Sequence, residues 1–420
     1  MKSVADVMIE LVRIAVCRDT SKTDAEGALS PKNTHDMRAL SEEFLERLYA
    51  LSHAHGLAQI VGYALKEQGI LPEGKLGDRF EKSMLGALLR SEKQEFELLA
   101  LSHVLEESHI DFIVLKGPAL RRLYPEGWMR KSSDVDVLVK PEQLDAAISA
   151  IRDRMGYEVG HRNIQDVSMF SPNGVHLELH FDLVHQSVVS SCEWELISRV
   201  WEYASLAEGK SFEYKLDDAF AYFYYLVHTA KHFAQGGCGV RSVLDLWLLC
   251  HDGERDEAAR AELVQRGGLE KFEAGARALA AYWFDSEQNA VDNGQNSVGG
   301  EKNTVEGELV LDMAEFILSG GRFGSFKNMA AAKKGMAKER GERSSYVVSR
   351  IFLPAEQMRS KYPTLERHPY LLPFMHVRRW VTMIANGRLS RSVAELGESA
   401  GVTSEQASAV GKMMSKLGLQ

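Results

Sequence analysis

The chain of 420 residues carries 50 Lys and Arg residues against 59 Asp and Glu residues, which gives a formal net charge of -9. Its 45% hydrophobic and 26% charged residues are typical of a globular protein of two or three domains. The acidic balance excludes a protein that binds polyanions through its overall charge, although a local basic site remains compatible with it.

The four cysteines are widely spaced and lack a CxxC pattern, so they predict neither a disulfide framework nor a zinc site. They are Cys17, Cys192, Cys238 and Cys250. The first residues, MKSVADVMIELVRIAVC, carry acids within their apolar part and no small-residue cleavage site. Apolar runs of about 20 residues, as needed to cross a bilayer, do not occur in the sequence. We expect a cytoplasmic protein without membrane insertion.

Residues 1–108 show apolar positions at helical spacing, as in EEFLERLYALSHAHGLAQIVGYAL, and predict an N-terminal helical region. The pattern then changes at residues 109–185, for which we predict an αβ core. Its expected elements, in chain order, are a strand at 111–116, a short helix at 119–124, a strand at 134–139, a helix at 142–156, and strands at 166–171 and 174–183. The sequence Pro172-Asn173-Gly174 predicts a hairpin turn between the last two strands.

Helical spacing returns at residues 186–284, which we expect to pack on the core. The segment 285–307 is rich in Asn, Gly and Ser and predicts a flexible loop. Residues 308–420 predict a C-terminal helical region. Within it, 327–343 is a cationic helix whose lysines alternate with acids, which favours a solvated face over nucleic-acid binding. The last residues, 388–420, have the rhythm of a small helix-turn-helix but carry few cations.

The stretch SSDVDVLV places two aspartates in an apolar strand. Side chains at i and i+2 of a strand point to the same face, so Asp134 and Asp136 project together, and the valines between them pack on the other face. Two adjacent carboxylates repel each other as bare charges and are well placed to bind a divalent cation through oxygen. We predict Mg²⁺, or Mn²⁺, as the compensating ion.

A third carboxylate is expected from a neighbouring strand. In VHLELHFDL, His176, Glu178 and His180 share one face, and we predict Glu178 as the third metal ligand and catalytic residue, with Asp182 as the rival. His180 is expected to orient Glu178 or to contact the nucleotide, unless it is a hydrogen-bonded structural residue.

The strand at 111–116 delivers Lys116 and Gly117 to the start of a helix, where free N–H groups favour phosphate. A triphosphate is the expected ligand. A helical segment further along carries His228 and His232 at i, i+4, but a second metal site there would need a third ligand. We expect these histidines, together with Lys231, Arg241 and Asp245, to form a polar network beside the site that faces nucleotide or acceptor.

The segments LKGPALRRLYPEGWMRKSSDVDVLV and VHLELH resemble the bacterial uncharacterised nucleotidyltransferase family of the DNA polymerase β-like superfamily. HTAKHFAQGGCGVRSVLDLWLL also resembles that family's helical pair. The resemblance implies an α+β fold, in which a small mixed sheet is embedded in helical N- and C-terminal regions. It also implies that Arg130 binds nucleotide phosphates, and we add Ser133 to the expected nucleotide-binding residues. The wider superfamily opens its site with Gly-Gly or Gly-Ser, where this chain has Lys116-Gly117.

These features together predict a metal-dependent nucleotidyltransferase that moves a nucleoside monophosphate, with AMP from ATP the favoured transfer, to an acceptor hydroxyl or phosphate. The sequence does not identify the acceptor or the oligomeric state. One alternative is a catalytically idle nucleotide sensor or antitoxin-like partner protein, in which loss of a metal ligand would be expected. A DNA-binding regulator acting through residues 388–420 is a further alternative.

Overall fold

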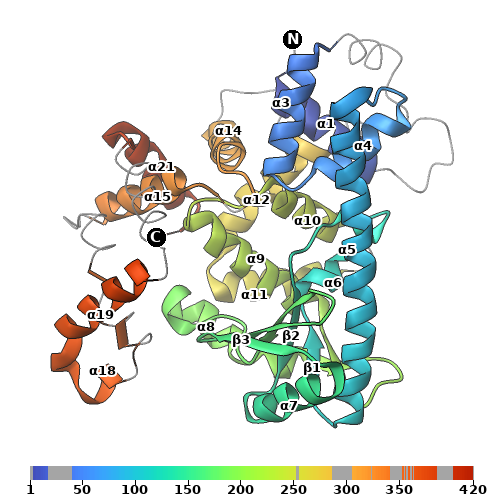
Figure 1. The fold of residues 1–420 in the computed structure, drawn as a ribbon. Coiled ribbons are helices and arrows are strands. Elements are labelled where there is room, and N and C mark those ends of the chain that lie inside the picture. The colour runs from blue at the N-terminus through green and yellow to red at the C-terminus, as the bar shows by residue number, and fades with distance from the viewer. Residues whose placement is uncertain are drawn as a thin grey trace. The chain divides into compact units, whose positions relative to one another are not determined.

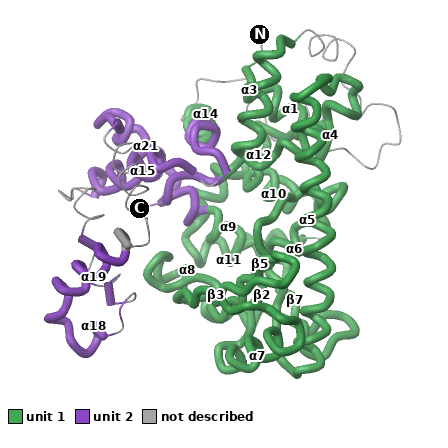
Figure 2. Tube along the Cα trace, viewed as in Figure 1, with its two compact units in different colours: residues 1–229, 239–314 green, residues 230–238, 315–420 purple. Residues whose placement is uncertain are grey.

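The computed structural model describes residues 3–17, 40–251, 255–285, 305–322 and 324–340, and nearer the C-terminus residues 352–353, 355, 358–359, 362, 364–385 and 401–419. Two compact units divide the chain (Figure 2). Unit 1 contains Met1–Thr229 and Gly239–Ala314, and unit 2 contains Ala230–Cys238 and Glu315–Gln420. The candidate residues on the sheet all lie in unit 1.

Unit 1 begins with helices, as the apolar spacing predicts (Figure 1). They are α1 (Val4–Val16), α3 (Glu42–Ala54), α4 (Ala58–Glu67) and the long α5 (Gly74–Glu107). Ser3 caps α1 in a reciprocal capping box with Asp6, which satisfies two backbone donors at the helix start. Helix α5 has 34 residues and ends at Glu107, shortly before the first strand of the sheet begins at Phe112.

A mixed sheet of seven strands follows, in the order β3-β4-β5-β2-β1-β7-β6. The strands are β1 (Phe112–Val114), β2 (Val135–Val139), β3 (Glu158–Arg162), β4 (Asp166–Phe170), β5 (His176–His180), β6 (Ala204–Leu206) and β7 (Glu213–Leu216). Strand β2 is parallel to β5 and antiparallel to β1. The hairpin predicted at Pro172-Asn173-Gly174 joins β4 to β5, and Gly174 supplies the positive φ of 77° in the turn. The α+β class predicted from the sequence is confirmed.

Three strands lie outside the predicted elements. Strand β3 is a fully exposed edge strand, so it lacks the apolar alternation that marks the inner strands. Strands β6 and β7 are three and four residues long and lie within the region predicted to be helical. Strand β7 pairs in parallel with β1, and the Phe112 N–H donates to the Phe212 carbonyl at 2.9 Å. The sheet therefore continues past the segment from which it was predicted.

Short helices connect the strands of unit 1. They are α6 (Lys116–Arg121), η2 (Gly127–Met129), η3 (Pro141–Gln143), α7 (Leu144–Met155), η4 (Gln186–Val188), α8 (Ser191–Ile197) and η5 (Val200–Tyr203). The later helices are α9 (Asp218–Ala234), α10 (Val240–His251), α11 (Glu257–Gly267), α12 (Glu270–Phe284) and α14 (Val305–Leu318), of which α9 and α14 cross between the two units.

The apolar face of the sheet packs against α5 and α7. Val135, Val137 and Val139 of β2 join Leu177 and Leu179 of β5 in this core. Leu101 and Leu105 of α5 and Ala147 and Ile151 of α7 complete it. Because successive strand residues alternate in direction, the other face carries the residues between these positions. That face holds the polar candidates.

Unit 2 contains α15 (Phe326–Glu339), the helix predicted from the cationic segment, and the C-terminal helix α21 (Ser404–Lys416). It also contains α18 (Thr364–Arg367), η6 (Pro369–Leu371) and α19 (Leu372–Ala385). Gly335 of α15 and Gly411 of α21 allow a close backbone approach, since a Cβ on Gly335 would lie 2.2 Å from the Ala407 carbonyl oxygen. Much of the predicted helix-turn-helix, 386–400, lies outside the described residues.

The predicted loop 285–307 also falls largely on residues 286–304, which are outside the described residues, whereas Val305 begins α14. Among the described helices, none is both long and apolar enough to cross a bilayer.

Candidate active site

The register of β2 and β5 assembles the carboxylates. Asp136 is the direct cross-strand partner of Glu178, and Val135 is the partner of Leu177. Asp134 precedes Val135 as His176 precedes Leu177, so Asp134, Asp136, His176, Glu178 and His180 share the face opposite the valine core. The structure thus brings the three predicted carboxylates together.

Two groups of potential metal ligands overlap on this face. One is Asp134, His176 and Glu178, the other is Asp136, Glu178 and His180, and the ligand atoms of each group lie within 4.8 Å of one another. Carboxylate oxygens are the usual ligands of Mg²⁺ and Mn²⁺, so this donor set fits a divalent cation. Asp182 belongs to neither group.

The two aspartates differ in their electrostatics. Burial raises the pKa of Asp134, and the neighbouring charges of Asp136 and Glu178 raise it further. Burial also acts to raise the pKa of Asp136, but a hydrogen bond from His180 and the charge of Lys116 outweigh it and lower that pKa. Added positive charge beside Asp134 would relieve the repulsion.

His180 is buried against the carboxylates, with only 5% of its surface exposed. Its Nε2 lies 3.3 Å from Asp136 Oδ1 and 3.6 Å from Glu178 Oε2. Burial alone would lower the pKa of His180, but the hydrogen bonds to these carboxylates raise it to about 9. The imidazolium therefore donates to Asp136 and fixes the orientation of its carboxylate.

Serine hydroxyls hold Asp134. Ser133 Oγ donates to Asp134 Oδ2 at 3.0 Å, and Ser132 Oγ donates to the Asp134 carbonyl at 2.9 Å. Ser132 is buried, whereas Ser133, the predicted nucleotide contact, is exposed beside the aspartate.

The turn formed by Leu115 and the first residues of α6, Lys116 and Gly117, lies beside the carboxylates; we call it the Gly117 turn. The Leu115 N–H donates to the Asp136 carbonyl at 3.0 Å, which ties the turn to β2. A Cβ on Gly117 would lie 3.4 Å from Ser132 Oγ and 3.9 Å from Asp136 Oδ2. A larger side chain would therefore enter the space beside the carboxylate. Lys116 Nζ lies 5.3 Å from the centre of the Tyr224 ring.

Arg130 occupies a buried position behind this turn. Its Nε and one terminal nitrogen donate to the two oxygens of Asp245, each at 2.9 Å, and its other terminal nitrogen donates to the Gly117 carbonyl at 3.1 Å. Arg130 is 5% exposed and Asp245 is 1% exposed. All three nitrogens of the guanidinium are thus engaged with the protein, and Arg130 holds the Gly117 turn. Its contact with nucleotide phosphates stays a prediction.

Asp245 is the centre of a larger network from α10. It accepts hydrogen bonds from Tyr124 Oη at 2.7 Å and from Tyr225 Oη at 3.5 Å. Arg241, one turn earlier on α10, donates to the Lys131 carbonyl. Arg241 and Asp245 thus each contact the loop between α6 and β2, Arg241 through the Lys131 carbonyl and Asp245 through Arg130. A single network that faces nucleotide or acceptor stays a prediction.

The three remaining predicted residues lie on α9, on either side of the boundary between the units. His228 belongs to unit 1, and its ring centre lies 6.4 Å from that of Tyr224. Lys231 and His232 belong to unit 2. Burial lowers the pKa of Lys231, and the His232 carbonyl accepts a hydrogen bond from the Gly237 N–H at 3.2 Å.

Tyr224 was missed from the sequence. It is 3% exposed, and burial together with the charges of Asp136, Glu178 and Asp182 raises its pKa, so its phenol lies in the field of the carboxylates. Its position in the aromatic run AFAYFYYLV gives no sign of this role, because the neighbouring aromatic residues are core.

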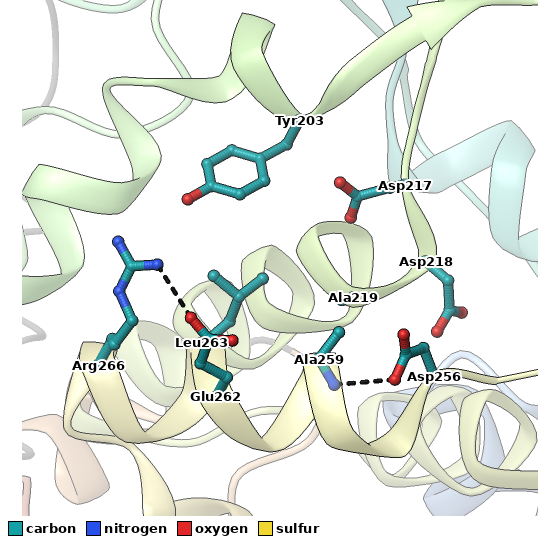
Figure 3. Close-up of a pocket in the computed structure, with 9 residues that line it drawn as sticks. All are labelled: Tyr203, Asp217, Asp218, Ala219, Asp256, Ala259, Glu262, Leu263 and Arg266. Atoms are coloured by element: carbon teal, nitrogen blue, oxygen red, sulfur yellow. Dashed lines mark hydrogen bonds and ion pairs between the residues drawn. The ribbon is translucent and has the colours of Figure 1, made fainter.

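A separate cavity of about 350 Å³ lies between the start of α9 and α11 (Figure 3). Its lining is acidic, but each carboxylate already has a partner in the protein. Asp256 accepts from the Ala259 N–H at 2.9 Å, Asp217 accepts from the Phe220 N–H at 2.7 Å, and Asp218 pairs with Arg260. This acidic corner, as we call it below, contains none of the predicted site residues.

Comparison with protein families gives a match over the part of the chain that holds the sheet. A family model described as "Uncharacterised nucleotidyltransferase" matches residues 41–285, more than half of the chain. No curated protein matches. The matched range includes the carboxylates of β2 and β5, the Gly117 turn and Asp245, and it implies nucleotidyl transfer with a nucleotide substrate. The chain therefore belongs to the uncharacterised nucleotidyltransferase family.

Proposed function

We propose that this protein is a divalent-metal-dependent enzyme that transfers a nucleoside monophosphate to an acceptor hydroxyl or phosphate, with AMP from ATP as the first transfer to test. The observation that carries the proposal is the cross-strand pairing of Asp136 with Glu178, beside Asp134 on the same face. Three carboxylates in this arrangement match the metal-binding needs of phosphoryl chemistry.

In this proposal Asp134, Asp136 and Glu178 hold the metal. When bound, a divalent cation would neutralise charge on the phosphates and polarise the α-phosphorus. Ser133 orients the Asp134 carboxylate, and the imidazolium of His180 orients that of Asp136. These residues keep the ligand oxygens in place before the nucleotide arrives.

The phosphates of the nucleotide are bound, in this proposal, by Lys116 and the Gly117 turn. Gly117 leaves the space beside Asp136 open, and Arg130 fixes the turn through the Gly117 carbonyl while Asp245 neutralises its charge. An oxygen of the acceptor attacks the α-phosphorus, the bond from that phosphorus to the bridging oxygen breaks, and pyrophosphate leaves with the bonding electrons. We propose Glu178, whose side chain is 29% exposed against 11% for Asp136, as the base that takes the acceptor's proton.

The decisive experiment supplies purified protein with each of four α-labelled nucleoside triphosphates, Mg²⁺ or Mn²⁺, and a cell extract as a pool of acceptors. The Asp134→Asn/Asp136→Asn double variant is run in parallel. We expect label on an acceptor with the wild type and none with the variant, and the labelled product identifies nucleotide and acceptor class.

Metal-dependent nucleotide binding without transfer would instead support a nucleotide sensor or partner protein. If neither binding nor transfer occurs under any condition, the proposal is wrong.

A further inference from the structure

His176 is a polar residue of the carboxylate face that the proposed mechanism does not use. Its Nε2 is buried and has no hydrogen-bond partner among the described residues. A buried ring nitrogen without a partner is uncommon, because its desolvation is not compensated. The His176 side chain also belongs to the ligand group that contains Asp134 and Glu178.

The position of the His176 ring is fixed by its neighbour on β4. Phe170 is the cross-strand partner of His176, and the two rings stack with centres 4.8 Å apart and planes inclined by 13°. Stacking restricts rotation of the imidazole, so the ring is held in place without any contribution from a metal. Such restriction is what a ligand residue requires in order to bind without a large loss of side-chain entropy.

The two histidines of β5 are used differently. His180 Nε2 is already occupied with Asp136 Oδ1 at 3.3 Å and lies close to Glu178, so it serves as a donor to carboxylates. For His176, neither an ion pair with a carboxylate nor a hydrogen bond from its Nε2 is found within the described part of the chain. Nε2 of His176 is therefore not engaged with another group in the described part of the chain.

We propose that Asp134, Glu178 and Nε2 of His176 form a cation site that prefers a transition-metal ion such as Mn²⁺, Co²⁺ or Zn²⁺ over Mg²⁺. Mg²⁺ strongly favours oxygen ligands, whereas imidazole nitrogen suits the later divalent ions. The inference rests on the proposed function only in that the same carboxylates bind metal. It assigns the metal preference of the site to one residue of this chain.

The test measures metal binding to the full chain in the absence of nucleotide. Mn²⁺ is titrated into metal-free protein and its free concentration is followed by electron paramagnetic resonance, and Mg²⁺ affinity is obtained by competition. The variant is His176→Gln, and the matched control is His161→Gln, which changes an exposed histidine on β3. Thermal unfolding of each protein verifies that it is folded.

We expect His176→Gln to weaken Mn²⁺ binding by about 10-fold or more and Mg²⁺ binding by less than about 3-fold, while His161→Gln matches the wild type. Pulsed resonance of the bound Mn²⁺ should show coupling to a ligand ¹⁴N that is present in the wild type and absent in His176→Gln. Unchanged Mn²⁺ affinity together with unchanged nitrogen coupling in His176→Gln would overturn the inference.

The outcomes separate this inference from the proposed function. Nucleotide transfer supported by Mg²⁺, with no preference for Mn²⁺ and no nitrogen coupling, would remove the role of His176 and leave the function intact. Failure of the wild type to bind any divalent cation would overturn both. Loss of Mn²⁺ preference and of the nitrogen coupling in His176→Gln, with Mg²⁺ affinity changed by less than about 3-fold, would establish the inference.

Discussion

Two acidic regions of unit 1 differ in how their carboxylates are compensated. In the acidic corner, Asp218 pairs with Arg260 and Asp256 accepts a hydrogen bond from the N–H of Ala259. On the carboxylate face, the side of β2 and β5 that carries Asp134, Asp136 and Glu178, burial raises the pKa of Asp134. The charges of the other two acids raise it further. The comparison teaches that acidity alone does not indicate a site. What distinguishes the carboxylate face is that one of its acids, Asp134, lies beside like charges, whereas Asp136 is compensated by His180 and Lys116.

The difference between the two acidic regions is tested most strongly by removing one carboxylate from each. Asp136→Asn removes a proposed metal ligand but keeps the shape of the side chain, and we expect nucleotidyl transfer to fall by about 1,000-fold or more. Asp256→Asn in the acidic corner should leave the rate unchanged. Initial rates with labelled nucleotide measure both. Equal losses in the two variants would show that the carboxylate face has no special role.

Asp245→Ala tests a third kind of acid, because Asp245 neutralises the buried guanidinium of Arg130 behind the site. Removing it leaves Arg130 buried without a counter-ion, and we expect a loss of about 3–5 kcal/mol in the free energy of unfolding. Tyr124→Phe, which removes one hydrogen bond to the same Asp245, should cost about 1 kcal/mol. Chemical denaturation measures both values. A loss for Asp245→Ala no larger than that for Tyr124→Phe would contradict the assigned role.

Asp218→Ala tests whether the acidic corner is structural. Arg260 is 2% exposed and would lose its main partner, while the Asp218 side chain is 41% exposed, so we expect a smaller loss of about 2 kcal/mol. The folded variant should keep its transfer rate. A lower transfer rate in Asp218→Ala, measured where the variant is fully folded, would show that the acidic corner affects the chemistry at the carboxylate face.

Asp134→Asn should change stability least, and it should raise the free energy of unfolding where the other variants lower it. Because the pKa of Asp134 is raised in the folded protein, its ionised form destabilises the fold near neutral pH, and the amide removes that penalty. A gain of about 1 kcal/mol in the free energy of unfolding raises the unfolding temperature of a large domain by about 2 °C. We expect a shift of this size for the metal-free variant relative to the wild type. The difference should vanish as pH falls and the wild-type carboxyl becomes protonated. A lower unfolding temperature at neutral pH would show that Asp134 is already compensated.

The carboxylate face could be predicted from the sequence because it depends on short-range alternation. In VHLELHFDL polar residues occupy every second position, and in DVDVLV the two aspartates alternate with valines; a parallel register then places Asp136 opposite Glu178. The hairpin between β4 and β5 was predictable for the same reason, since its turn residues are adjacent.

Contacts between distant segments could not be predicted in this way. Nothing near Arg130 indicates that its partner is Asp245, which is 115 positions away, and the resemblance alone suggested a phosphate role for this arginine. Strands β6 and β7 are too short to show a periodic pattern, and the pairing with β1 that gives β7 its place is nonlocal. The position of Tyr224 near the carboxylates likewise depends on where α9 packs.

The ion pair between Arg130 and Asp245 can form only after the ribosome has synthesised both partners, which lie 115 positions apart. The Gly117 turn is held by an arginine whose counter-ion lies on α10, so in a nascent chain that ends before Asp245 this arginine lacks the partner with which it is buried in the complete fold. Closing so long a loop is a late and slow event in folding. A chain interrupted anywhere before α10 would therefore lack the ion pair that anchors Arg130 against the Gly117 carbonyl, so this part of unit 1 is complete only after Asp245 has been translated.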